Sequence, residues 1–281
     1  MAGTPNLRLR LPGRAENVLL VRQALTGLSE AIGLDAVALN DLSTAVTEAC
    51  NNVVMHAYGG QEGPMEVELC ASSSGLEAIV RDHGSGLRPG VKTDEEVAGG
   101  IGMPVITALS DSVEFREVPG GGTEVAMHFT PALSPPLELP EGEDGAQLEA
   151  IERSAGRGDV TMMAVAPTEI ARAVVPRVLS TLAARAYFTT DRISDTQLVA
   201  DALVAHTDGA TSTSHLNVDV SVQPRHLEVR IGPLLRGRAE AVVGAAAGDG
   251  LGSVLERLTD GHAVSSSGSA ETLALTLSQN D

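Results

Sequence analysis

Apolar residues recur along the chain at two spacings, and each spacing predicts one kind of element. Runs in which every second residue is apolar predict strands with one buried side, and apolar residues three and four apart predict helices with one buried side. In the first half these spacings predict, in order, a strand at 7–11, helices at 14–32 and 36–58, strands at 65–70 and 76–81, a short helix at 101–109, and strands at 112–118 and 123–129.

The second half repeats this order of elements. The same spacings predict a strand at 160–165, helices at 168–186 and 195–205, strands at 216–222 and 227–231, a helix at 251–258, and strands at 263–266 and 272–277. Arg22 corresponds to Arg172, and Gly100-Ile101-Gly102 corresponds to Gly250-Leu251-Gly252, at one offset. We interpret the chain as a tandem duplication in which each copy is an α/β two-layer sandwich, with helices on one face of a mixed sheet.

The two halves are separated by a segment without apolar periodicity. Prolines stand at 131, 135, 136 and 140, and acidic residues cluster at 141, 143 and 144. This composition is typical of a linker between domains, and the alternative is a long functional loop inside one domain. We therefore expect domains at 1–130 and 160–281, joined by a linker at 131–159.

Composition and charge narrow the classes of function. Hydrophobic residues make up 43% of the 281 positions, enough for a globular core, and no uninterrupted apolar run is long enough to span a membrane. The first residues are polar and lack the apolar stretch of a secretory signal, and two cysteines are too few for a disulfide framework. The 37 acidic and 19 basic residues give a net charge of −18, which disfavours nucleic acid and anionic membranes. A cytoplasmic protein is the simplest interpretation.

The second predicted helix carries a polar stripe. Glu48, Asn52 and His56 follow one another at intervals of four, so their side chains share a face. A carboxylate beside a carboxamide offers a base and an oxygen ligand for Mg²⁺, which binds oxygen donors and keeps waters and substrate phosphates. Taken alone, such a pair is more typical of a solvated helix face.

Two glycine-rich segments add candidate ligand contacts. The strand that ends at Asp82 is followed by Gly84 and Gly86, so an acid able to accept a hydrogen bond from an exocyclic amine precedes a backbone without Cβ atoms. Further on, Gly100 and Gly102 open a helix, and free N–H groups at such a start bind phosphate. The alternatives are an ordinary turn and a flexible loop, and the lysine of a P-loop is missing.

Taken together in this order, the segments resemble a known family. With Gly121-Gly122-Thr123 before the last strand of the first half, they are similar to the N, G1, G2 and closing boxes of Bergerat-fold (GHKL, histidine-kinase-like) ATPases. The run Thr47-Glu48-Ala49-Cys50-Asn51-Asn52-Val53-Val54-Met55-His56-Ala57-Tyr58, and Glu16-Asn17 with Arg22 five positions after the asparagine, resemble the bacterial anti-sigma-factor serine/threonine kinases. The resemblance covers about residues 7–129.

The resemblance implies a role for each matching residue. Glu48 would be the general base toward a substrate hydroxyl, and Asn52 would ligate Mg²⁺ bridging the ATP phosphates. Asp82 would read the adenine amine, and Arg22 would dock protein partners. The remaining positions would line the nucleotide: Gly84 and Gly86 beside the base, Gly100 and Gly102 at the phosphates beneath a lid at 87–98, and Thr123 at the adenine end.

The second copy departs from this pattern. Asp201 stands near the position of the base, but Ala205 takes the place of the metal-binding asparagine and cannot ligate a metal. The strand that should end in an acid and glycines reads Ile231-Gly232-Pro233-Leu234-Leu235. We therefore expect a degenerate domain that does not bind ATP.

The resemblance implies an ATP-binding anti-sigma regulator. It would phosphorylate a serine or threonine of an anti-anti-sigma (STAS-type) partner and sequester a sigma factor. The alternative is a non-catalytic, nucleotide-dependent binding module of the same fold. A sensor histidine kinase fits least, because the phospho-accepting helix pair is missing. We expect no direct contact with nucleic acid or membrane, and either a homodimer or one chain whose second copy replaces the partner subunit.

Overall fold

The computed structural model describes residues 5–72, 75–85, 102–130, 159–207, 209–245 and 253–279. The chain divides into two compact units, Met1–Leu139 and Pro140–Asp281. The expected linker lies outside the described residues except for position 159. Among the described residues, no helix is both long and apolar enough to cross a membrane.

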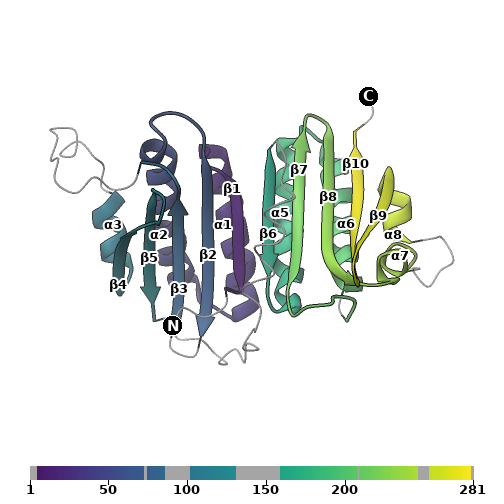
Figure 1. Cartoon of the computed structure of the whole chain (residues 1–281), viewed down its shortest axis with the longest axis horizontal. Helices are drawn as coiled ribbons and strands as arrows, with labels where there is room; N and C mark the ends of the chain where they lie inside the picture. The colour runs from purple at the N-terminus through teal and green to yellow at the C-terminus, as the bar shows by residue number, and fades with distance from the viewer. Residues whose placement is uncertain are drawn as a thin grey trace. The chain divides into compact units, whose positions relative to one another are not determined.

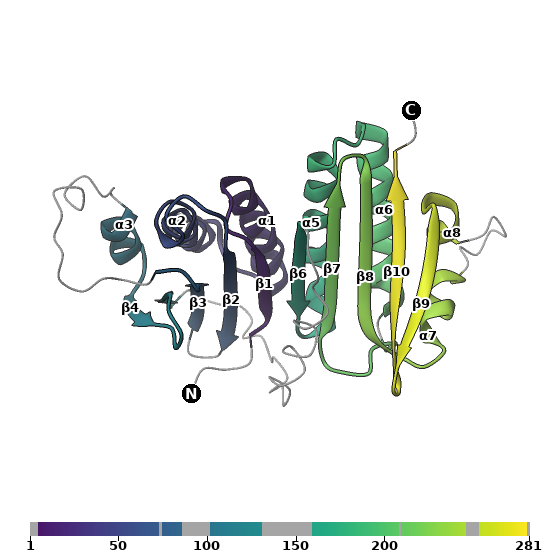
Figure 2. The same ribbon diagram turned by 45° about the horizontal axis from the view of Figure 1, so that its top comes forward.

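The first unit is an α/β two-layer sandwich, as expected (Figure 1). Its strands pair in the order β4-β5-β3-β2-β1, and Figure 2 shows its helices on one face of this sheet. The elements are β1 (Leu7–Pro12), α1 (Ala15–Ile32), α2 (Ala36–Asn52), η1 (Val53–Ala57), β2 (Pro64–Ser72), β3 (Gly75–Asp82), α3 (Gly102–Leu109), β4 (Ser112–Glu117) and β5 (Thr123–Phe129).

The core of this unit lies between the sheet and its helices. Strand β1 alternates buried and half-buried residues, with Leu7, Leu9 and Leu11 at most 2% exposed. The turn between the two long helices is defined at both of its ends. Gly33 ends α1 in the left-handed conformation that suits glycine, and Asp35 caps α2 by accepting from two backbone N–H groups. This capped start fixes the register of α2, which carries the polar stripe.

Strand pairing differs from the mixed sheet that we expected. Every neighbouring pair of strands described within the first unit is antiparallel, and so is every pair within the second. The reason lies in the connections. In the first unit, two helices rather than one follow β1. The chain therefore runs along the sheet once in each direction before β2 begins, so β2 is antiparallel to β1.

The second predicted helix also differs from its predicted form. Its α-helical part ends at Asn52, and one turn of π-helix, Val53–Ala57, follows. Apolar periodicity could not reveal this turn, because a single wide turn shifts the spacing by only one residue.

The second unit has the same two-layer architecture, with strand order β6-β7-β8-β10-β9. Its elements are β6 (Val160–Val165), η2 (Thr168–Ile170), α5 (Ala171–Arg185), α6 (Thr190–Thr207), β7 (Leu216–Gln223), β8 (His226–Leu235), α7 (Arg238–Val243), α8 (Val254–Leu258), β9 (Gly261–Ser267) and β10 (Ala270–Ser278). Helix α7 was not predicted.

Helix α6 begins five residues before its predicted start, in a polar turn. Arg192, in this turn, ties it to residues outside the helix: its guanidinium donates to the carbonyls of Ser278 and Leu258, each at 2.9 Å, and to the carboxylate of Asp260. Since these contacts are tertiary and polar, they leave no apolar signal in the sequence.

Candidate functional site

The polar stripe of α2 faces the first residue of α3. A Cβ atom on Gly102 would lie 3.1 Å from Oε2 of Glu48 and 3.5 Å from Oδ1 of Asn52. Both side chains are half-buried, and Gly102 is buried. The structure therefore brings together three residues from two segments that are 50 positions apart in the sequence, and the close approach leaves little room for any side chain at 102.

His56 does not join this group. The π-helical turn begins after Asn52, which breaks the four-residue spacing of the stripe, and His56 is exposed. Glu48 and Asn52 remain as the polar pair that α2 presents to α3.

Asp82 ends β3 with its side chain turned inward. The residue is 5% exposed, and its alternation with Val80 and Ala78 places it on the helix-covered face of the sheet. Its Oδ1 atom accepts a hydrogen bond from the Gly84 N–H at 2.8 Å. This bond uses Oδ1 and orients the carboxylate at the end of the strand.

The loop after Asp82 is built for glycine. A Cβ atom on Gly84 would lie 2.0 Å from the carbonyl oxygen of Ala57, the last residue of the π-helical turn. Gly122, at φ +107, comes so close from the other side that its Cβ would lie 2.1 Å from the carbonyl oxygen of Asp82. The Ser85 N–H donates to Ala57 O at 2.9 Å. Gly84 and Gly122 therefore allow the close backbone approaches on either side of this loop, and Thr123 is half-buried just beyond Gly122.

Tyr58, which the sequence pattern did not single out as functional, also contacts this loop. Its hydroxyl accepts a hydrogen bond from the His83 N–H at 2.9 Å. The residue follows directly on the π-helical turn η1, so α2 contributes Glu48 and the segment that continues it contributes the contact near Asp82.

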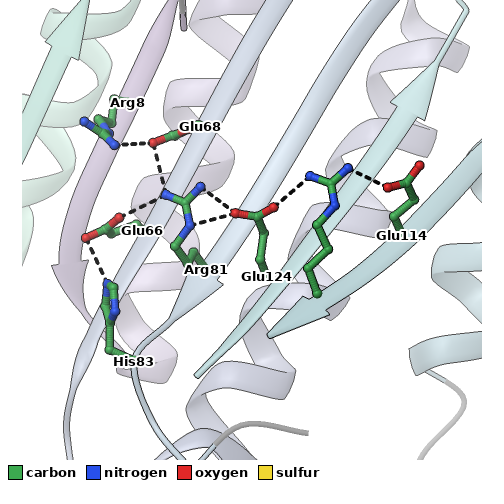
Figure 3. Close-up of polar contacts among 8 residues, drawn as sticks. Arg8, Glu66, Glu68, Arg81, His83, Glu114 and Glu124 are labelled. Carbon is green, nitrogen blue, oxygen red and sulfur yellow. Dashed lines mark hydrogen bonds and ion pairs between the residues drawn. The ribbon is translucent and has the colours of Figure 1, made fainter. Parts of the chain in front are cut away.

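A ladder of charged side chains crosses the opposite face of the same sheet (Figure 3). At its centre, Arg81 donates to Glu124 at 2.6 and 2.9 Å and lies 3.3 Å from both Glu66 and Glu68. Burial by itself lowers the pKa of Arg81, but the hydrogen bond to Glu124 and the surrounding carboxylates outweigh it and raise that pKa. The outer neighbours extend the ladder: Arg8 pairs with Glu68, His83 with Glu66, and Arg116 with Glu124 and Glu114.

This charge ladder supports the strand that ends in Asp82. Burial raises the pKa of Glu66 and of Glu124, but hydrogen bonds and positive neighbours outweigh burial and hold both below their usual range. Both carboxylates therefore stay charged at neutral pH and bind the guanidinium of Arg81, the residue before Asp82.

Several predicted positions lie elsewhere or cannot be placed. Gly86, Gly100 and the lid at 87–98 lie outside the described residues. Arg22 is exposed on α1, and α2 lies between α1 and α3 (Figure 2). The structure therefore does not bring Arg22 together with the group at Gly102.

The described residues offer few protein ligands for a metal ion. Among the residues that the structure describes, no three His, Cys, Asp or Glu side chains are grouped to hold a metal. Asn52 supplies one amide oxygen beside Gly102. One oxygen ligand suits Mg²⁺ held mainly by substrate phosphates and water.

The second unit lacks the corresponding geometry. Its β8 continues through Gly232 and Pro233 to Leu235, whereas β3 stops at Asp82 and turns. Asp201 is exposed on α6. The segment 250–252 lies outside the described residues.

Known proteins are similar to this chain over its first unit. A family model described as a histidine kinase-like ATPase domain matches residues 11–129. The serine-protein kinase RsbW of Bacillus pumilus is 30% identical over 136 residues, which cover 43% of this chain and 83% of that protein. RsbW of Listeria monocytogenes is 35% identical over 121 residues, covering 38% of this chain and 77% of that protein.

Among solved structures, the RsbU and RsbW domains of Rv1364c from Mycobacterium tuberculosis match at 22% identity with a TM-score of 0.35, covering 46% of this chain and 33% of that one. That score is too low to compare the two folds. Sequence similarity and the matched family model carry the assignment: through residues 11–129 this chain belongs to the histidine kinase-like ATPase family and is a relative of the RsbW serine-protein kinases.

Proposed function

We propose that the first unit binds Mg-ATP and transfers the γ-phosphoryl group to a serine or threonine of an anti-anti-sigma (STAS-type) protein. In its ATP-bound form it would sequester a sigma factor. The observation that carries the proposal is the meeting of Glu48 and Asn52 with Gly102 at the start of α3. It puts a base and a metal ligand beside backbone N–H groups that can bind phosphate.

The residues divide the work of phosphoryl transfer, which requires positioning and charge neutralisation more than covalent chemistry. Glu48 takes the proton of the attacking hydroxyl as its oxygen bonds the γ-phosphorus and ADP leaves, and the amide oxygen of Asn52 would hold Mg²⁺. When bound, Mg²⁺ would neutralise charge on the phosphates. Asp82 accepts a hydrogen bond from the adenine amine through Oδ2. Because the net charge is −18, the backbone N–H groups and the metal ion are needed to hold the anionic phosphates.

We assign the remaining residues the roles that the family pattern implies. Gly84 and Gly86 lie beside the base, Gly100 and Gly102 at the phosphates, and Thr123 at the adenine end. Arg22 docks the partner proteins from α1, away from the group at Gly102. We assign residues 1–130 to the active domain and residues 160–281 to a degenerate copy, joined by the linker 131–159. The chain acts in the cytoplasm, as a homodimer or with the second copy in the partner subunit's place.

Phosphate transfer to a cognate anti-anti-sigma protein tests this proposal. Glu48→Gln keeps the shape of the side chain but removes the base, so we expect transfer to fall at least about 100-fold while Mg-ATP still binds. Asp41→Asn, on the same helix, is the matched control and should transfer as the wild-type chain does. Equal transfer by wild type and Glu48→Gln would refute the role of Glu48. Tight Mg-ATP binding without transfer by either would favour the non-catalytic module.

A further inference from the structure

Tyr58 links the start of β2 to the peptide that follows its paired strand β3, just beyond the Met65–Asp82 pair that ends their ladder. Its hydroxyl accepts from the His83 N–H at 2.9 Å and donates to the carbonyl of Pro64 at 2.5 Å. His83 stands between Asp82 and Gly84, and Pro64 is the first residue of β2. The hydroxyl thus ties the peptide that follows Asp82 to the neighbouring strand.

The ring of Tyr58 is fixed as well as its hydroxyl. A Cβ atom on Gly63 would lie 2.1–2.4 Å from three ring carbons, so the ring occupies the space that any side chain at 63 would need. The hydroxyl also keeps its proton. Burial raises the pKa of Tyr58, as do the negative charges of Asp82 and Glu66, against the opposite effect of the hydrogen bond from His83.

The other contacts of the loop hold different groups from the one that the Tyr58 hydroxyl holds. The Asp82 carboxylate is oriented locally by the Gly84 N–H, and Ser85 is held by Ala57 O. The imidazole of His83 lies 3.3 Å from Glu66. Between them, the His83 N–H is the backbone donor next to Asp82, and Tyr58 is the acceptor that holds it.

We infer that Tyr58 is a positioning residue for base recognition: its hydroxyl holds the Asp82–His83 peptide so that Oδ2 of Asp82 meets the 6-amino group of a purine. This inference rests on the proposed binding of ATP. Tyr58 does not touch the reacting atoms, so it sets the preference for a 6-amino purine rather than the rate of transfer.

The test compares ATP with purine riboside 5′-triphosphate, which lacks only the 6-amino group. In the full chain, Tyr58→Phe keeps the ring and removes the hydroxyl. We expect its affinity for Mg-ATP to fall about threefold to tenfold, the usual effect of one hydrogen bond, with at most about a twofold change for the analogue. The ratio of the two affinities therefore falls. Gly63→Ala, which displaces the ring, should lower the same ratio.

Two further measurements separate this role from a general loss of structure. Tyr187→Phe is the matched control, because Tyr187 is the other tyrosine of the chain and is 76% exposed. It should leave both affinities unchanged. Without nucleotide, amide hydrogen exchange followed by NMR should be about threefold to tenfold faster at His83 in Tyr58→Phe than in the wild type.

The outcomes distinguish this inference from the proposed function. An unchanged affinity ratio in Tyr58→Phe, or equal losses for both nucleotides, would overturn the positioning role. If the wild-type chain binds neither nucleotide, the proposed function fails and the base preference fails with it. In that case His83 exchange still decides whether the hydroxyl holds the loop: faster exchange would support that contact, and unchanged exchange would overturn it.

Discussion

Gly84 is the position at which one added methyl group should damage the nucleotide site most. In Gly84→Ala the new Cβ would lie 2.0 Å from Ala57 O, a backbone atom that no side-chain rotation can move. Cβ atoms essentially never lie within 3.0 Å of a heavy atom from beyond the neighbouring residues, so the loop or the π-helical turn must move by about 1 Å or more. The wild-type arrangement around Asp82 cannot be kept.

The size of the loss follows from the hydrogen bonds involved. The movement strains the bond from Gly84 N–H to the Asp82 carboxylate at 2.8 Å and the bond from Ser85 N–H to Ala57 O at 2.9 Å. A hydrogen bond to a charged group contributes about 1.5–3 kcal/mol and a neutral one about 1 kcal/mol. Losing both gives about 2.5–4 kcal/mol, and an affinity for Mg-ATP at least about 60-fold weaker.

Isothermal titration calorimetry with Mg-ATP measures this loss directly. Gly261→Ala is the matched control, because a Cβ at Gly261 meets no atom within 4 Å and the position lies in the other unit. It should bind Mg-ATP as the wild type does. Wild-type affinity in Gly84→Ala would refute the claim that this loop forms the adenine end of the site.

Two further predictions concern stability. Burial raises the pKa of Asp219 to about 6, so its negative charge increasingly opposes folding as the pH rises from about 4 through 6. Asp219→Asn should therefore increase the free energy of unfolding by up to about 3 kcal/mol at pH 8 and by little at pH 4. Thermal melts at the two pH values check this against Glu169→Gln, a change at an exposed carboxyl group of the same unit; no gain at pH 8 for Asp219→Asn would contradict it. Arg81→Met should lower the free energy of unfolding by about 2 kcal/mol, because three carboxylates no more than 14% exposed lose a partner. The loss is not larger because Arg8, Arg10 and Arg116 still neutralise them. Arg230→Met, which breaks an exposed pair with Glu228, should lower the free energy of unfolding in urea by less than about 1 kcal/mol. Equal losses in the two variants would show that the charge ladder does not stabilise the first unit more than an exposed pair does. The stabilising charges of Glu66 and Glu124 have lowered pKa values, so wild-type stability should fall as the pH drops below about 4, and less so in Arg81→Met.

Elements with one buried face could be predicted closely from the sequence. Strands β5 and β6 have the predicted bounds, and β1, whose apolar alternation directly reflects its alternate burial, extends one residue further. The π-helical turn and the start of α6 could not be predicted, since the first depends on hydrogen-bond register and the second on the contacts of Arg192. The expectation of a mixed sheet was wrong although the two predicted helices after the first strand already favour an antiparallel β1–β2 pair.

The candidate site was predictable as residues but not as an arrangement. Spacing and order identified Glu48, Asn52 and Asp82, while the approach of Gly102 to the first two required the tertiary structure. Tyr58 was missed as a functional residue because a tyrosine after a helical run reads as its end. The charge ladder did leave a signal: charged residues at alternate positions, such as Arg8 with Arg10 and Glu66 with Glu68, mark one face of the sheet.

The most direct test of the account is the number of Mg-ATP molecules that the full chain binds, and their dependence on Asp82. We predict one equivalent by calorimetry, with an affinity at least about tenfold weaker in Asp82→Asn, because an amide cannot replace the carboxylate as acceptor for both Gly84 and the base. Two equivalents, or binding that Asp82→Asn leaves unchanged, would contradict a single ATP site at Asp82 in the first unit.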